Sequence, residues 1–307
     1  MKRKTKTILA NLMMLTAAAV WGMSFVVMKT TLNVIPANTV LALRFTAGAL
    51  GLCYTLFKHR LTLKKAGAGA LVGAVLYAAF ALQTFGLKYT TASKNAFITV
   101  VYVVLVPVFY WFVKKDRPSL RIACSALLCF FGIGLLTLTD AFTVGLGDAL
   151  TLVSGGLYAL HIVLVGLYEE KCDVVFLTFL QFFFAAVYSW GAALLTEPLP
   201  VTIPSGSWPS LAYLCLLSTL LGFTFQNIGI KYSEPSVAAL ILSTESMFAC
   251  LFSVVLLGDE LTLRMWAGAL CIIVSLVWSQ TRSKSRKDTG APCVNEDPHS
   301  LPSSEEV

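Results

Sequence analysis

Two stretches of sequence 143 residues apart decide the fold: QTFGLKY at residues 83–89 and QNIGIKY at residues 226–232. The match extends without a gap over residues 83–135 and 226–278, where 13 of 53 aligned pairs are identical. Apolar helices resemble one another by composition alone, so the matched polar residues are decisive; they include Asp116 with Asp259 and Arg121 with Arg264. The chain therefore contains an internal repeat.

The earlier parts of the two repeats agree more weakly, at a shift of 137 residues. There Trp21 aligns with Tyr158, Ser24 with His161, and Phe45 with Phe182. This alignment predicts two halves, residues 8–139 and 140–281, between a short N-terminus at 1–7 and a polar, disordered tail at 282–307.

The composition places both halves in a membrane. Apolar and aromatic residues make up 57% of the 307 residues and charged residues only 13%, against about 45–50% and 25% in a soluble domain. A membrane helix needs about 20 mostly apolar residues, and ten such spans are predicted: 8–28, 39–57, 66–87, 95–113, 120–139, 149–168, 174–196, 208–230, 235–257 and 263–281. The expected fold class is an all-α integral membrane protein.

The formal net charge of +7 reflects membrane topology rather than binding to nucleic acid, because the basic residues lie between apolar runs. With the N-terminus inside, 18 lysines and arginines fall on the inner side and three, Lys88, Lys94 and Arg264, on the outer side. Positively charged loops are retained in the cytoplasm. We therefore expect a multi-pass protein of the inner (plasma) membrane with both termini cytoplasmic.

Five spans in each half have a topological consequence. An odd number of crossings makes the second half enter the membrane from the opposite side, so the two halves form an inverted repeat. Such repeats typically place a binding site near mid-depth between the halves and suit alternating access. We expect the ten helices to surround a central cavity.

Several motifs resemble a known family. They are AVWGMSF at 19–25, LRF at 43–45, GLKYTTA at 86–92, YVVLVP at 102–107 and GDELT at 258–262. Their order within two five-helix repeats is similar to the drug/metabolite transporter superfamily, specifically its ten-helix EamA-like exporters. The resemblance implies a basket-like secondary transporter with a central cavity that commonly exports amino acids or other small metabolites. Helix nine of such proteins often carries Glu-Pro at mid-span, whereas this chain has Glu245-Ser246.

Two charged residues inside spans are the leading candidates for substrate recognition. Glu245 lies near the middle of its span and Arg44 about five residues inside helix two. Glu245 could bind a substrate amine, carry a coupled proton or serve as a structural acid. Arg44 could hold a substrate carboxylate bidentately, extend toward the interface, or lock helix packing.

Further polar and aromatic residues suggest the wall of a pocket. Thr151, Ser154, Tyr158 and His161 form one stripe of helix six, where His161 could relay protons or simply pack. Buried amides serve both as ligands and as contacts between helices. The predicted binding residues are Trp21, Ser24, Arg44, Gln83, Asn95, Tyr102, His161, Gln181, Gln226 and Glu245.

Other classes of function find little support. The spans hold one histidine and no nucleophile–base constellation, which argues against an enzyme. No phosphate-binding loop for a primary pump occurs, and the eight cysteines show no metal-ligand spacing, so we expect no catalytic residue, metal or cofactor. The expected partners are a small-molecule substrate and the lipid bilayer, with a homodimer left open. A non-transporting membrane scaffold or sensor is the alternative function.

Overall fold

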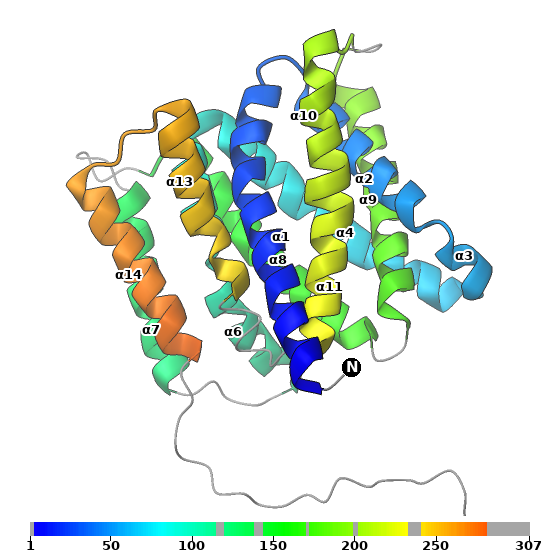
Figure 1. The fold of residues 1–307 in the computed structure, drawn as a ribbon, viewed down its shortest axis with the longest axis horizontal. Helices are drawn as coiled ribbons and strands as arrows, with labels where there is room; N and C mark the ends of the chain where they lie inside the picture. The colour runs from blue at the N-terminus through cyan, green and yellow to red at the C-terminus, as the bar shows by residue number, and fades with distance from the viewer. Residues whose placement is uncertain are drawn as a thin grey trace, which may run out of the picture.

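The computed structural model describes residues 3–114, 120–137, 144–169, 172–198, 202–232 and 241–280. Within these ranges the chain consists of helices joined by short turns. The predicted tail at 282–307 and several of the predicted inner links lie outside the described residues. Figure 1 shows the helices as one bundle.

The helices of the first half follow the predicted spans closely. They are α1 (Arg3–Thr31), α2 (Ala37–Leu52), α3 (Thr55–Lys58), α4 (Leu63–Tyr89), α5 (Ala92–Thr99), α6 (Tyr102–Lys114) and α7 (Leu120–Thr137). The second half contains α8 (Leu146–Glu169), α9 (Val174–Thr196), η1 (Ser205–Ser207), α10 (Trp208–Ala212), the π-helix η2 (Tyr213–Leu221), α11 (Gly222–Tyr232), α13 (Glu245–Leu257) and α14 (Leu263–Gln280).

Length and composition qualify six of the described helical segments to cross a membrane, and four shorter apolar helices accompany them. The ends of the helices obey local rules. Helix α9 occupies the predicted range 174–196, because the Asp173 carboxylate accepts the N–H groups of Val175 and Phe176 at its start. Helix α13 ends at Gly258, whose φ of 71° is the left-handed conformation that glycine adopts most easily.

Four predicted spans are not continuous α-helices. The second is interrupted near its end, at Cys53 and Tyr54, between α2 and α3. The fourth is interrupted at Val100 and Val101, between α5 and α6. The ninth is interrupted at Thr244, immediately before α13. The eighth continues from α10 through η2 into α11, with π-helical backbone in its middle. The length of the apolar runs predicted the positions of the spans, but it did not predict the interruptions or the π-helical segment within them.

The two halves interleave rather than forming separate bodies. Helix α4 packs along α8 and α9, α2 along α9, and α1 along α13 and α11. Figure 1 shows α1 between α13 and α11, and shows α7 beside α14 at one edge of the bundle. Each helix of the central part therefore touches the other half, so a site built there draws on both halves.

Candidate functional site

The fourth and ninth spans meet at their breaks. Tyr102 is the first residue of α6 and Glu245 the first residue of α13. The Tyr102 hydroxyl donates to Oε1 of Glu245 at 3.2 Å. These residues are 143 apart, which is the shift that aligns the repeats. The contact thus joins two positions that the repeat makes equivalent.

Hydroxyl side chains satisfy the backbone that the second break exposes. The Thr244 hydroxyl donates to the carbonyl of Ile241 at 2.6 Å, and that of Ser246 donates to the carbonyl of Ser243 at 3.0 Å. Ser and Thr are able to replace lost backbone partners in this way inside membranes. The span therefore breaks without the proline that the family often carries after the glutamate, and Pro107 lies within α6 rather than at the first break.

A glycine from the opposite half lies against each break. A Cβ atom on Gly22 of α1 would lie 2.5 Å from Phe248 Cβ and 2.8 Å from the Ala249 nitrogen, in the first turns of α13. A Cβ atom on Gly155 of α8 would lie 2.5 Å from Cγ1 of Val101. Glycine is needed where helices approach so closely. Because α1 and α8 each begin their half, the two contacts follow the same pattern.

Arg44 is a buried cation without a counterion among the described residues. Its side chain is 4% exposed. Its Nε donates to the hydroxyl of Thr219 and its Nη2 to that of Ser218, both at 3.0 Å. No described carboxylate lies within ion-pair distance of it. Arginine keeps its charge and offers five N–H donors, so the site retains positive charge and free donors suited to an anion.

The π-helix η2 shapes the surroundings of Arg44. It brings the Thr219 hydroxyl to the carbonyl of Leu214, five residues earlier, at 2.8 Å. In the same helix, the carbonyl of Ser218 accepts a hydrogen bond from the indole N–H of Trp21, also at 2.8 Å. A Cβ atom on Gly222 would lie 2.5 Å from the same indole nitrogen. π-Helical segments occur frequently at functional sites, and this one presents two hydroxyls to a buried cation.

Aromatic rings connect Arg44 to Glu245. The Arg44 guanidinium lies over the ring of Phe80 at 5.0 Å, and the Phe80 ring meets that of Tyr158 at 5.4 Å. Tyr158 in turn lies 6.5 Å from Tyr102, which holds Glu245. Arg44 and Glu245 are not an ion pair in this conformation. The structure therefore keeps the guanidinium and the carboxyl group apart across an aromatic wall.

A polar network extends from Tyr158 toward the first break. The Tyr158 hydroxyl donates to Oε1 of Gln83 at 2.9 Å, and Nε2 of Gln83 donates to the Thr99 hydroxyl at 3.0 Å. Asn95 donates to the Thr151 hydroxyl at 2.7 Å. Its Oδ1 is buried and has no partner within the described chain. The network fixes α4, α5 and α8 around the break.

His161 and Gln181 form a separate pair between α8 and α9. A ring nitrogen of His161 lies 2.8 Å from Oε1 of Gln181, and both side chains are buried. The same stripe of α8 also places the Ser154 hydroxyl on the carbonyl of Ala79. The stripe predicted on this helix thus contacts neighbouring helices along its length.

The ten predicted binding residues fall into three groups. Trp21, Arg44, Gln83, Asn95, Tyr102 and Glu245 belong to the connected polar and aromatic centre. His161 and Gln181 contact each other. Ser24 donates to the carbonyl of Trp21 in its own helix, and half-buried Gln226 makes no hydrogen bond to the described residues.

The sequence did not predict some residues of this centre. The hydroxyl pair Ser218 and Thr219 and the rings of Phe80 and Phe223 were not singled out, although Phe223 packs edge-on against Trp21 at 5.4 Å. Two adjacent hydroxyls in the middle of an apolar span were the available signal for the first pair. The phenylalanines carry no signal that separates them from ordinary core residues.

One end of the bundle is closed by acids of the second half. Glu197 accepts the N–H groups of Asn38 and Thr39 at 2.6 and 2.9 Å, at the start of α2. Pro36, which precedes α2, has no side-chain oxygen to do so. A carboxylate is favourable at a helix N-terminus. The second half thereby caps a helix of the first.

Two further acids act at the same end. Asp259 accepts the N–H and the hydroxyl of Ser93 at 3.4 and 3.1 Å, near the start of α5, and also bonds to the hydroxyl of Ser253. Asp148 accepts the Thr90 hydroxyl at 2.5 Å and lies 3.7 Å from Nζ of Lys94. We call Asp148, Glu197 and Asp259 the acidic clamps. They hold the halves together where the positive-inside count predicts the outer side.

Two of the hollows at the surface of the described chain lie away from the polar centre. One is lined by residues 56–61 around α3, and the other by residues of α1 and α11 that include Lys6, Met13 and Tyr232. None of the ten predicted binding residues lines either hollow. In this conformation, the described side chains of the polar centre contact one another.

Several known proteins are similar to this chain in sequence or in fold. The sequence pattern of the EamA-like transporter family matches residues 8–138 and again 145–280. The chain belongs to the EamA-like transporter family. It is therefore a multi-pass membrane transporter of the drug/metabolite transporter superfamily and not an enzyme, and its two matching regions account for the internal repeat.

Individual relatives place this EamA-like transporter among proteins from distant organisms. It is 32% identical to an uncharacterized transporter of Archaeoglobus fulgidus, over 89% of this chain and 86% of that one. It is 25% identical to the uncharacterized transporter YvbV of Bacillus subtilis, with 93% and 94% covered. It is also 25% identical to solute carrier family 35 member B1 of Xenopus laevis, with 69% and 73% covered.

The fold of this EamA-like transporter also resembles a solved structure. That structure, described only as a crystal structure of a protein, superposes with a TM-score of 0.66 and covers 88% of this chain and 96% of its own. The sequence identity is 16%. The likeness therefore concerns the fold alone.

Proposed function

We propose that this transporter is a secondary carrier that exports a small zwitterionic metabolite, such as an amino acid, by alternating access. Its halves, residues 8–139 and 140–281, would be threaded in opposite senses, with both termini in the cytoplasm of an inner-membrane protein. The observation that carries the proposal is the contact of Tyr102 with Glu245. Discontinuous helices that meet at corresponding positions of two repeats mark the binding site in many secondary transporters.

The two separated charges define the substrate class. Arg44 would bind the carboxylate of the substrate with the N–H donors that Ser218 and Thr219 leave free. Glu245, which is 6% exposed and has only Tyr102 as a described hydrogen-bond partner, would bind the ammonium group. The rings of Trp21, Phe80 and Tyr158 would enclose the body of the substrate. In this conformation the acidic clamps would close the outer side.

The other predicted residues would support this site. Gln83 and Asn95 would position Tyr158 and the first break, and His161 with Gln181 would hold α8 against α9. Ser24 and Gln226 would come into contact with substrate only after the halves move. The central cavity would then form when the Tyr102–Glu245 contact opens.

A counterflow assay tests the proposal. Proteoliposomes loaded with single unlabelled amino acids are supplied with the same labelled compound, and wild type is compared with Glu245→Gln and Arg44→Gln. Each variant would remove one charged contact to the substrate, and loss of one partner of such a buried contact costs about 2–5 kcal/mol of binding, so flux should fall about 30-fold or more. Lys88→Gln removes a charge at the bundle end and is the matched control.

The outcomes separate the transporter from the alternative. Saturable counterflow that survives Lys88→Gln and disappears in both site variants supports the carrier, provided that all proteins remain monodisperse. Wild-type protein without counterflow for any compound of a broad metabolite panel would favour a non-transporting scaffold or sensor. Undiminished flux in Glu245→Gln would refute the assigned site.

A further inference from the structure

The connection between α2 and α4 has the features of a membrane-surface element. It contains the short helix α3 and the extended residues that follow it. Phe57 and Leu63 are each 91% exposed, which is unusual for large apolar side chains unless they contact lipid or a partner. Tyr54, also exposed, adds an aromatic ring of the kind that collects at membrane interfaces.

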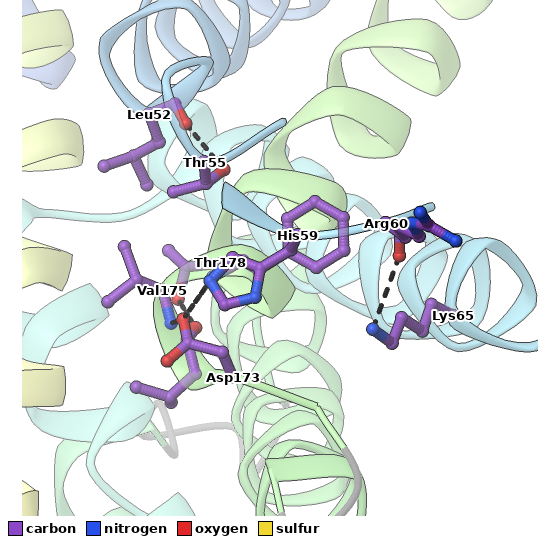
Figure 2. Close-up of polar contacts among 10 residues, drawn as sticks. Leu52, Thr55, His59, Arg60, Lys65, Asp173, Val175 and Thr178 are labelled. Carbon is purple, nitrogen blue, oxygen red and sulfur yellow. Dashed lines mark hydrogen bonds and ion pairs between the residues drawn. The ribbon is translucent and has the colours of Figure 1, made fainter. Parts of the chain in front are cut away.

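The same connection carries a dense positive charge. Lys58, Arg60, Lys64 and Lys65 fall within eight residues. The Asp173 carboxylate, which lies beside His59 in Figure 2, is already engaged. It accepts two N–H groups at the start of α9 and lies 3.7 Å from Nε2 of His59. The cluster therefore retains a net positive charge.

Two of the positive residues, Lys58 and Arg60, line a surface hollow. Residues 56–61 line an open hollow of about 490 Å³, many times the ~30 Å³ that one water molecule occupies. The Lys65 ammonium donates to the Arg60 carbonyl at 3.3 Å and lies over the Phe176 ring, and the Lys58 ammonium lies over the Tyr54 ring at 5.2 Å. Figure 2 shows the Arg60 guanidinium directed away from the groups drawn around it.

We propose that this hollow binds the phosphate headgroup of an anionic phospholipid. Arg60 would grip the phosphate, since its planar guanidinium suits bidentate phosphate recognition. Lys58 and Lys64 would add attraction, and Phe57 and Leu63 would insert among the acyl chains. Basic clusters beside membrane helices bind anionic lipids in this way. The positive-inside count places this end in the cytoplasmic leaflet, where such lipids would be available.

Lipid titration of the full-length protein tests the site. Delipidated protein in detergent is titrated with phosphatidylglycerol or with phosphatidylcholine of the same acyl chains, and bound lipid is counted by native mass spectrometry. Wild type should take one phosphatidylglycerol at least tenfold more tightly than phosphatidylcholine. Arg60→Gln/Lys64→Gln should weaken phosphatidylglycerol about tenfold or more, and leave phosphatidylcholine unchanged.

A charge-matched control makes the result specific. Lys88→Gln/Arg264→Gln removes two cations at the opposite end and should retain wild-type affinity for phosphatidylglycerol. Equal losses in the two double variants would overturn the proposal, because general charge would then explain binding. Displacement of the lipid by millimolar inorganic phosphate would overturn it in favour of a soluble anion. If the double variant fails to fold, the single variant Arg60→Gln, altered at an exposed position, should also bind phosphatidylglycerol more weakly than wild type.

Discussion

The two helix breaks occupy equivalent positions in the repeat but present different chemistry. The first break leads into α6 with a phenol, Tyr102, and the second leads into α13 with a carboxyl, Glu245. The two groups bond to each other. Position within the repeat thus locates the contact, whereas the chemistry of the contact comes from residues in which the halves differ.

The breaks also differ in how they are supported. The first is surrounded by a side-chain network from Gln83, Asn95 and Thr99, which ties it to α4 and α8. The second depends on the local hydroxyls of Thr244 and Ser246 and on the close approach of α1 at Gly22. The first break is therefore held mainly by side-chain hydrogen bonds, and the second mainly by close packing of a neighbouring helix.

Exchange of Tyr102 and Glu245 should have the largest effect on counterflow. Tyr102→Glu alone places a second carboxyl beside Glu245 in a buried site, and we expect counterflow to fall about 100-fold or more. The double variant Tyr102→Glu/Glu245→Tyr restores one phenol and one carboxyl at the two positions, in exchanged places. It should recover activity to within about tenfold of wild type. A double variant as inactive as the single one would show that the two positions are not interchangeable.

Removal of the hydrogen bond between Tyr102 and Glu245 alone should have a smaller effect on counterflow. Tyr102→Phe keeps the ring against Tyr158 but leaves Glu245 without its described partner. The loss of a hydrogen bond to such a group costs about 1.5–3 kcal/mol, so counterflow should drop about tenfold. Phe80→Leu, which leaves the bond intact, serves as a comparison for altered packing. Wild-type rates in Tyr102→Phe would remove the bond from the mechanism.

Substitution of Gly22 and of Gly155 tests whether a neighbouring helix packs more tightly against the second break than against the first. Gly22→Ala meets Cβ and backbone atoms that cannot rotate away, whereas Gly155→Ala meets first a methyl group of Val101. Overpacking costs about 1–3 kcal/mol. We expect the melting temperature in detergent to fall by about 5 °C for Gly22→Ala and about 2 °C for Gly155→Ala. The reverse order would contradict the packing described here.

A proline at the second break should have the smallest effect. Ser246 lies in the first turn of α13, where proline is well tolerated. Ser246→Pro should leave counterflow within about twofold of wild type. Val103→Pro, at the equivalent place in α6, removes the bond from the Val103 N–H to the Val100 carbonyl at 3.0 Å and should reduce counterflow more. Similar losses in the two variants would show that the breaks tolerate proline alike.

The sequence predicted where most helices lie and that Arg44 and Glu245 are buried among them. Apolar length located the spans, and charge inside them identified Arg44 and Glu245. The 143-residue shift also aligns Tyr102 with Glu245, so their contact could have been predicted from the repeat together with a two-fold axis. The family membership rests on motifs that were visible in the sequence.

The remaining features depend on contacts between distant residues. Val100 and Val101 are β-branched and apolar, and nothing local marks them as a break. The partners of Arg44 lie 174 and 175 residues away in a π-helix that no sequence pattern announced. The acidic clamps were visible only as acids in the second-half links, and what they cap became clear from the assembled helices.

Accessibility of the polar centre from the two sides of the membrane tests the account most directly. Ser24 lies one turn from Trp21, and Ser24→Cys in a cysteine-free chain places a small thiol beside the centre. In proteoliposomes, a membrane-impermeant maleimide should label it from either side, and saturating substrate should change the two labelling rates in opposite directions. Labelling from one side only, at a rate that substrate leaves unchanged, would contradict alternating access.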